Sequence, residues 1–365
     1  MRLILTIALL VAIILATPSI SAAAQTESPK SPRLTLSAEA LVLARFGTAR
    51  RVLVEKVPGS EHFANVSTAT STDVLNSTDL EQGYTPGFRL GAAYHFNPKY
   101  DISVSYSRIN DWDTTESVGP NSPPDWLVMK APGGFFQTQD FSFQSMTWDY
   151  STKLHNAELS VQNQYSDRIK ILAGFRWLQL SEDLQGTIPP KDRILPLWKV
   201  DPNLTLYDVA RIENLPGIPN TEDLPPFWDT STRNNLYGFQ AGADIKLFGR
   251  GRFSVNGLVK AGGYWNHASE STVVSIEKKL FGSSARTDRP AFVGEAGLQC
   301  KYQFSNGLAL KVGYEALWLE GIALAPSQIE KTNCTFNPVS VTAQGVNSDS
   351  NTLFHGVTAG LEYSF

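Results

Sequence analysis

Apolar and polar residues alternate along much of this chain, most clearly at its end. Val357, Ala359, Leu361, Tyr363 and Phe365 alternate there with small or polar residues. Successive side chains of a β-strand point to opposite faces, so this pattern predicts a strand with one apolar face that runs to the last residue. Nine earlier segments alternate in the same way: residues 34–43, 88–96, 100–106, 157–165, 169–177, 237–247, 253–265, 292–304 and 308–318.

Short and long connections alternate between these segments. Four are tight turns rich in Asn, Asp, Gly or Pro: Asn97-Pro98-Lys99, Ser166-Asp167, Gly249-Arg250-Gly251 and Ser305-Asn306-Gly307. The other five are long, roughly residues 47–83, 110–146, 182–234, 266–289 and 320–351. Short periplasmic turns and long extracellular loops are typical of outer-membrane barrels. The predicted fold class is therefore all-β: a transmembrane, antiparallel, up-and-down β-barrel of about ten strands, with both termini in the periplasm.

The longest connection leaves the strand number open. Within it, residues 194–200 and 204–209 flank Asp201-Pro202-Asn203, which has the composition of a turn. These two stretches could form an extracellular hairpin, which we favour, or two further spanning strands. The second arrangement would raise the strand number from ten to twelve.

The predicted outward faces carry aromatic residues at their ends and no charge at their centres. Trp177, Trp265 and Trp318 stand at the loop ends of three strands. Aromatic rings favour the bilayer interfaces, whereas a central Arg or Lys would cost ~2–4 kcal/mol. The partners we expect are therefore outer-membrane lipid and the barrel-assembly machinery, since Tyr363 and Phe365 resemble a C-terminal assembly signal. The aromatic residues at the turn ends are Phe96, Tyr100, Tyr165, Phe253, Phe304 and Phe365.

The beginning of the chain predicts export. Arg2 is followed by an apolar run over residues 3–16, by Pro18 and by the small-residue site Ala22-Ala23-Ala24. This is the pattern of a secretory signal peptide cleaved after Ala24. The apolar run is shorter than the ~20 residues that span a bilayer as a helix. The predicted organisation is a signal peptide (1–24), a flexible periplasmic segment (25–33) and the barrel (34–365).

Composition and cysteine content narrow the function classes. Loss of Arg2 with the signal peptide leaves 30 basic and 35 acidic residues, a net charge of −5, which argues against nucleic-acid binding. Cys300 and Cys334 are too few for a disulfide framework. We expect no bond between them, because one lies on a predicted strand near the periplasm and the other in an extracellular loop. The sequence sets no oligomeric state.

Three segments carry a family resemblance: residues 172–184 (LAGFRWLQLSEDL), residues 232–245 (TRNNLYGFQAGADI) and residues 293–329. From about residue 169 to the end, the chain resembles a family of β-barrel porins of planctomycete bacteria. The resemblance implies an outer-membrane barrel and a porin role. It carries over no site residue.

The predicted inward face mixes charges of both signs. A barrel of about ten strands is only slightly wider than one filled by its own side chains. Two functions therefore remain, and the family resemblance places the first ahead of the second. The resemblance implies a porin or a narrow channel for ions or small polar solutes, whereas the narrow lumen favours a plugged structural or surface-recognition barrel that acts through its extracellular loops. The candidate lumen-lining residues are Arg89, Asp101, Lys170, Arg176, Asp244, Lys260, Glu295, Lys311 and Glu315.

An outer-membrane barrel enzyme is a third class, to which we give less weight. Asp111, Asp113 and His267 stand at loop ends of predicted strands, and paired carboxylates with a histidine can activate water. No acid next to His267 in the sequence would orient its ring, however, so we predict no catalytic activity. We also expect no cofactor and no metal site, because the remaining histidines lack the spacing of metal ligands; they are His62, His95, His155 and His355.

Overall fold

The structure is a computed structural model that describes residues 33–47, 50–57, 71–80, 82–120, 126–129, 142–189, 227–276, 279–304, 307–336 and 339–365. The predicted signal peptide and nearly all of the segment after it lie outside these residues. So do the 194–209 hairpin and His62. The strand number reported below therefore refers to the described part of the chain.

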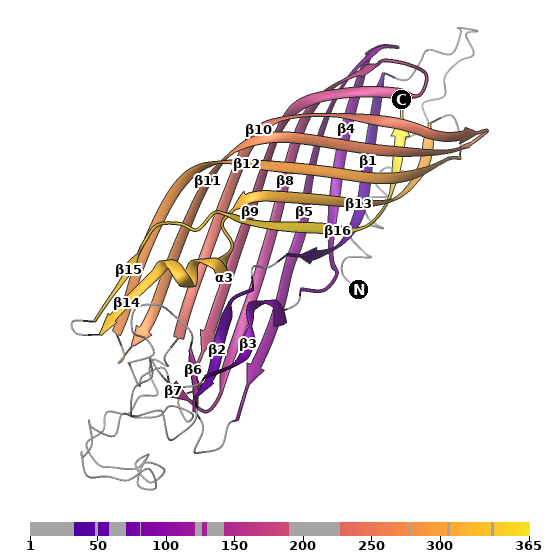
Figure 1. Cartoon of the computed structure of the whole chain (residues 1–365). Coiled ribbons are helices and arrows are strands. Elements are labelled where there is room, and N and C mark those ends of the chain that lie inside the picture. The colour runs from indigo at the N-terminus through magenta and orange to yellow at the C-terminus, as the bar shows by residue number, and fades with distance from the viewer. Residues whose placement is uncertain are drawn as a thin grey trace, which may run out of the picture. The chain divides into compact units, whose positions relative to one another are not determined.

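Ten strands of the described chain close into an antiparallel barrel, in the order β1-β16-β13-β12-β11-β10-β9-β8-β5-β4. Each barrel strand pairs with the barrel strands that precede and follow it in the chain, and β16 pairs with β1 to close the ring (Figure 1). This confirms the predicted fold class. The barrel strands are β1 (Leu34–Phe46), β4 (Thr85–Asn97), β5 (Tyr100–Val118), β8 (Met146–Gln164), β9 (Ile169–Thr187), β10 (Phe227–Arg250), β11 (Phe253–Ile276), β12 (Lys279–Gln303), β13 (Leu308–Ile322) and β16 (Ser350–Ser364).

Smaller elements occupy three of the long connections. A four-stranded sheet in the order β3-β2-β6-β7 comes from the two connections before β8, and a two-stranded sheet pairs β14 with β15. No helix within the described residues is long and apolar enough to cross a membrane. These elements are β2 (Val52–Val57), β3 (Thr72–Asn76), η1 (Ser77–Asp79), β6 (Trp126–Met129), β7 (Ser142–Phe143), α3 (Ala325–Gln328), η7 (Ile329–Lys331), β14 (Thr332–Phe336) and β15 (Val339–Ala343).

The last strand closes the barrel against the first. Ala40 of β1 lies opposite Ala359 of β16, and the register continues to Thr35 opposite Ser364. Beyond the strand ends, the Phe365 amide donates to the Leu34 carbonyl at 2.8 Å, and the Arg33 amide donates to the Phe365 carbonyl at 2.9 Å. The final residue thus has both backbone groups in the closing seam.

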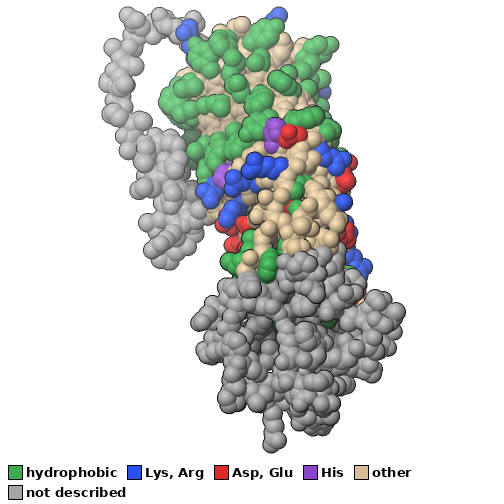
Figure 2. All heavy atoms as spheres, turned by 90° about the vertical axis from the view of Figure 1, so that its left-hand side faces the viewer, with side chains coloured by type: hydrophobic (Ala, Val, Ile, Leu, Met, Phe, Trp, Pro, Cys, Tyr) green, Lys and Arg blue, Asp and Glu red, His purple; other side chains and the backbone are tan. Residues whose placement is uncertain are grey.

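The alternation predicted for the outward faces is present in the structure. Outward apolar side chains are exposed where lipid would cover them, as Val104 (53%), Leu159 (52%) and Leu298 (56%) illustrate. Figure 2 shows such side chains gathered over one part of the wall. The aromatic residues predicted for the turn ends are exposed too, as a girdle at the interface requires.

Several strands are much longer than predicted. β10 and β11 have 24 residues and β12 has 25, whereas a bilayer needs about 9–11. The predicted loop 266–289 was wrong for this reason, since β11 continues to Ile276 and β12 starts at Lys279. Beyond Trp265 most outward positions of β11 are polar, and the buried inward positions include polar Glu270 and Thr272 as well as Ala268 and Val274. Because polar residues stand on both faces, the segment was misread as a loop.

We call this extension the outer wall: residues 108–118, 146–155, 179–187, 227–235, 267–276 and 279–288 of β5, β8, β9, β10, β11 and β12. Its interior is filled rather than open. One buried apolar cluster includes Trp112, Leu180, Leu319 and Phe354, and a second includes Trp148 and Trp228 together with side chains of β2, β6, β7 and α3. Elements from the long connections therefore pack inside the wall.

Candidate functional site

The membrane part of the lumen is crossed by charged side chains from inward strand positions. The central one is Arg176 of β9, which is only 1% exposed. Its guanidinium reaches Glu295 of β12 at 2.7 Å and Glu158 of β8 at 3.4 Å. Because β10 and β11 lie between β9 and β12 in the sheet, the contact with Glu295 spans the lumen instead of following the wall.

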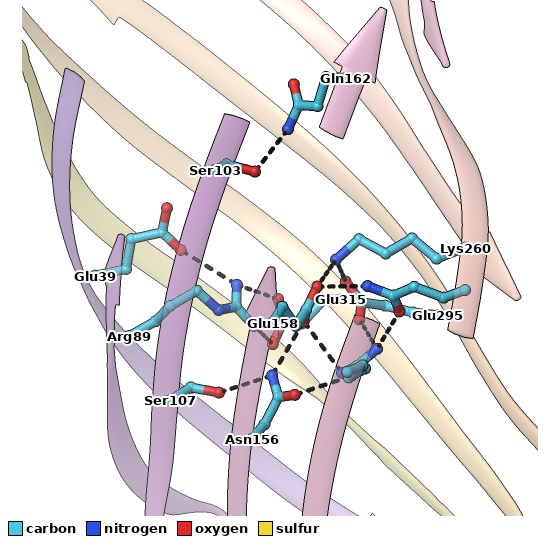
Figure 3. A network of polar contacts seen from close by, with 12 residues as sticks. Glu39, Arg89, Ser103, Ser107, Asn156, Glu158, Gln162, Lys260, Glu295 and Glu315 are labelled. Atoms are coloured by element: carbon cyan, nitrogen blue, oxygen red, sulfur yellow. Dashed lines mark hydrogen bonds and ion pairs between the residues drawn. The ribbon is translucent and has the colours of Figure 1, made fainter. Parts of the chain in front are cut away.

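Lys260 of β11 completes this first group. Its ammonium contacts Glu158 at 2.9 Å and Glu295 at 3.0 Å, so each carboxylate is shared between the lysine and Arg176. Figure 3 shows Lys260 directed toward both carboxylates. Neutral side chains satisfy the remaining guanidinium N–H groups: Arg176 donates to Asn156 at 2.9 Å and to Gln240 at 3.3 Å.

A second group lies around Arg89 of β4. Arg89 donates two hydrogen bonds to Glu315 of β13, at 2.8 and 2.9 Å, and one to Glu39 of β1 at 3.3 Å. Lys311 of β13 contacts the same Glu39 at 2.6 Å. Because β1 and β16 lie between β4 and β13, this bidentate pair also crosses the lumen (Figure 3).

The two groups balance their charges. Four cations, Arg89, Arg176, Lys260 and Lys311, face four carboxylates, Glu39, Glu158, Glu295 and Glu315. Lys311 also contacts Glu362 at 3.6 Å, whose charge Lys301 balances. A void of about 20 Å³ lies between the two groups and the apolar residues above, with Arg89, Arg176 and Leu317 in its lining. That space suits about one water molecule. The arrangement can hold a water and seal the lumen, and its balanced charge favours neither anions nor cations.

Polar residues nearer the periplasmic end form a smaller cluster. Asp101 of β5 contacts His95 at 2.6 Å and Lys170 of β9 at 3.1 Å. Asp244 of β10 stands apart and accepts a hydrogen bond from Asn256 at 2.7 Å. The nine predicted lumen residues thus fall into three ion-pair groups and one separate carboxylate.

A further buried ion pair within the outer wall was not predicted. Arg45 of β1 contacts Glu182 of β9 at 2.5 Å, and both side chains are almost fully buried. Arg45 also donates to the Tyr150 hydroxyl at 2.6 Å. The sequence prediction ended the first strand at Leu43 and assigned Glu182 to a loop. The sequence did carry one signal for a buried polar interior here. The alternate positions Tyr150 and Thr152 of β8 have side chains with hydroxyl groups that can serve as hydrogen-bond partners.

The three residues of the enzyme hypothesis do not converge. Asp111 contacts Lys153 at 3.3 Å, and Asp113 lies on the outward face of β5. His267 lies on β11, with β8, β9 and β10 between it and β5. The statement that no acid orients His267 was wrong, since Asp288 of the paired strand β12 lies 2.7 Å from its Nδ1. Both side chains are more than half exposed.

The two cysteines lie in different elements, Cys300 in β12 and Cys334 in β14. Cys300 of β12 is an exposed free thiol, and Cys334 lies in β14, where its side chain is not described. The absence of a bond between them therefore stays a prediction. Within the described residues, no group of three or more His, Cys, Asp or Glu side chains is placed to hold a metal ion.

Comparison with solved structures finds barrels of low sequence identity. The outer membrane protease OmpT from Escherichia coli has a TM-score of 0.49 and 10% identity, with 93% of this chain and 99% of that one covered. The translocator domain of the autotransporter NalP from Neisseria meningitidis has a TM-score of 0.40 and 7% identity, with coverage of 93% and 90%. The Pseudomonas putida toluene transporter TodX has a TM-score of 0.26 and 10% identity, with coverage of 97% and 93%.

No curated protein matches the chain. One family model does, described as "Legionella pneumophila major outer membrane protein precursor", and it matches residues 28–365. The assignment to planctomycete porins, suggested by three segments, stays a prediction. The match spans the whole barrel, so the chain belongs to the family of the Legionella pneumophila major outer membrane protein and is an outer-membrane β-barrel protein of a Gram-negative bacterium.

Proposed function

We propose that this protein is a closed barrel that acts at the cell surface, with its membrane part as an anchor and its outer wall as the working surface. The observation that carries the proposal is the pair of lumen-spanning contacts, Arg176 with Glu295 and Arg89 with Glu315. Charged pairs with these distances resist hydration of the lumen, because each group would exchange a charge-assisted hydrogen bond for one to water. The proposal assigns the chain no catalytic role.

The interior of the outer wall supports the same proposal. A solute that passed the charged groups would next meet Trp112, Leu180 and Phe354, all of which are buried. Displacing such side chains would open cavities in a packed core, at about 2–5 kcal/mol for each large residue. Strands of 24–25 residues extend well beyond the bilayer. A surface role explains this extension better than transport alone does.

A porin or narrow channel is the second candidate. The family resemblance to porins favours it, as does the void of about 20 Å³ beside polar side chains of the lumen. In this alternative, water or small ions pass the charged groups in single file when the pairs fluctuate. Charge reversal at Arg176 or Lys260 would then change conduction.

Solute uptake by vesicles distinguishes these candidates. The refolded full-length mature chain is reconstituted into phospholipid vesicles, and a gel that detects heat-modifiable migration confirms folding. A closed barrel gives no swelling in isotonic solutions of a small sugar or a small amino acid beyond that of empty vesicles. Swelling that depends on solute size would overturn the closed barrel and support a porin.

Assembly into the membrane is proposed to depend on the C-terminal aromatic residues. Tyr363 and Phe365 face outward, 38% and 59% exposed, with their ring centroids 4.7 Å apart. In this orientation the pair is available to barrel-assembly machinery before the seam with β1 closes.

A further inference from the structure

The outer wall begins at a row of aromatic residues that the strand register defines. Tyr106 of β5 lies opposite Ala157 of β8, which lies opposite Trp177 of β9. The row continues through Tyr237 of β10 to Trp265 of β11. Aromatic rings of this kind mark the interface between hydrocarbon and head groups. On each strand the aromatic position is therefore a local reference for the outer membrane surface, and the row as a whole is inclined to that surface because the strands are tilted by ~40°.

The outward positions four residues beyond the aromatic row form what we call the cationic row. Lys153, Ser181, Arg233, Ser269 and Arg286 are direct partners across β8, β9, β10, β11 and β12. Cations and serines thus alternate from strand to strand. With strands about 4.8 Å apart, neighbouring cations are separated by roughly 10 Å with a hydroxyl between them.

Between the two rows runs a polar row that adds further donors. Arg108 lies opposite His155, and across the next strands follow Gln179, Asn235, His267 and Asp288, the last of which lies 2.7 Å from His267. Arg108, Arg233 and Arg286 are exposed, and no ion pair is found for them in the described part of the chain. Lys153 has Asp111 at 3.3 Å as a partner.

The charge changes sign farther out. The next outward row holds Asp113 and Asp183, and the one after it holds Asp149 and Asp229. Together they line a groove of about 410 Å³ with no cation in its lining. On the described parts of β5, β8 and β10, the cations Arg108, Lys153 and Arg233 therefore lie nearer the aromatic row than these carboxylates do. Figure 2 shows charged and histidine side chains in a band next to the hydrophobic surface.

The height of the cationic row fits one class of ligand. Four residues along a strand correspond to about 14 Å, and a strand tilt of ~40° reduces this to roughly 10 Å above the aromatic row. Lys and Arg side chains can extend back toward the membrane by several ångströms. Their charged ends then lie at the level of lipid phosphate groups.

We propose that the cationic row binds the phosphate groups of anionic lipids in the outer leaflet, and that the acidic rows beyond it set the upper limit of the lipid layer on these strands. Arg233 and Arg286 are suited to bidentate contacts with phosphate oxygens, and Ser181 and Ser269 supply hydroxyl donors between them. The inference is independent of whether the lumen conducts.

Tryptophan quenching by brominated lipids tests the proposal on the full-length chain in vesicles. Trp177 and Trp265 lie on the membrane side of the cationic row, four residues along their strands from Ser181 and Ser269, so their emission reports lipids close to it. Brominated phosphatidic acid is compared with brominated phosphatidylcholine to obtain a relative association constant. We expect a preference for phosphatidic acid that falls by at least about five-fold in the triple variant Lys153→Gln, Arg233→Gln, Arg286→Gln, since each cation near an anionic surface contributes about that factor.

The matched control is the triple variant Lys99→Gln, Arg250→Gln, Arg252→Gln, which removes three exposed cations from the turns at the other end of the barrel. It should keep the preference of the wild type, and heat-modifiable migration verifies folding of both variants. A wild type without preference, or a cationic-row variant that retains it, would overturn the proposal. Loss of the preference when inorganic phosphate replaces chloride at constant ionic strength would assign the row to free phosphate and also overturn the lipid assignment.

Discussion

Arg176 of β9 and Glu295 of β12 meet at 2.7 Å across the lumen although two strands separate them along the wall. Each of the two side chains has further partners, since Lys260 contacts Glu295 and Arg176 donates a hydrogen bond to Asn156. The pair therefore crosses the lumen as part of a neutral network. Its four charged members come from four different strands, so the network depends on how the barrel brings these strands together.

Removal of one member of this network should destabilise the barrel strongly. Arg176→Ala leaves Glu158 and Glu295 with Lys260 as their shared cation, and breaking a buried pair by removing one partner costs about 3–5 kcal/mol. Denaturant unfolding of the refolded chain in detergent measures the change. Arg250→Ala, at an exposed turn, is the control and should shift the unfolding free energy by less than about 0.5 kcal/mol. Equal effects of the two substitutions would refute a structural role of the network.

Glu270 predicts a pH dependence of stability. It lies on β11 beyond Trp265, in the outer wall and outside the membrane, and it is 3% exposed. Burial raises the pKa of its carboxyl from 4.5 to about 7, although Thr272 donates a hydrogen bond to Oε2 at 3.2 Å. Its other oxygen, Oε1, has no hydrogen-bond partner among the residues that the structure describes. The folded state therefore favours the protonated form.

The raised pKa of Glu270 determines whether stability rises or falls with pH. Between about pH 4.5 and 7 the unfolded chain loses the Glu270 proton first, so stability falls as pH rises, by on the order of 3 kcal/mol in total. Glu270→Gln should remove this fall and be more stable than the wild type at pH 8. Unfolding free energies at a series of pH values, with the exposed Glu116→Gln as control, measure it. Parallel wild-type and Glu270→Gln curves would show that Glu270 does not titrate in this way.

The position of Phe365 at the end of the last strand should matter more for assembly than the loss of an aromatic ring as such. Phe365→Ala removes the last ring of the predicted assembly signal, whereas Phe304→Ala removes another exposed girdle ring at the same end of the barrel. We expect a several-fold smaller folded fraction in cell membranes for Phe365→Ala alone, read from heat-modifiable migration. If both variants assemble as the wild type does, the terminal residue carries no assembly signal.

The membrane part of this fold could be predicted from the sequence because lipid imposes a strict rule on outward positions. Leu90, Val104 and Val312 had to be apolar, and the turn at Asn97-Pro98-Lys99 had to be short, so alternation and turn chemistry located the strands. The same alternation predicted that Arg176 and Lys260 point inward. It could not predict which residues they pair with, because contacts across a lumen depend on how the barrel closes.

The outer wall could not be predicted in the same way. Outside the membrane, outward positions such as Ser271 and Ser284 face water, and inward positions such as Thr272 pack against elements from distant loops. Polar residues on both faces resemble a loop by composition. The partnership of His267 with Asp288 was missed for this reason, since it depends on a β11–β12 pairing that the loop assignment denied.

Single-channel conductance of the refolded mature protein in a planar bilayer tests the closed lumen most directly. Insertion is verified by recovery of the heat-modifiable form, and the double variant Arg176→Ala, Lys260→Ala serves as a comparison that loses two cations of the charged network. The closed barrel predicts no stable conductance steps for the wild type. Stable wild-type steps that change in the double variant would contradict it and show an open path through these residues.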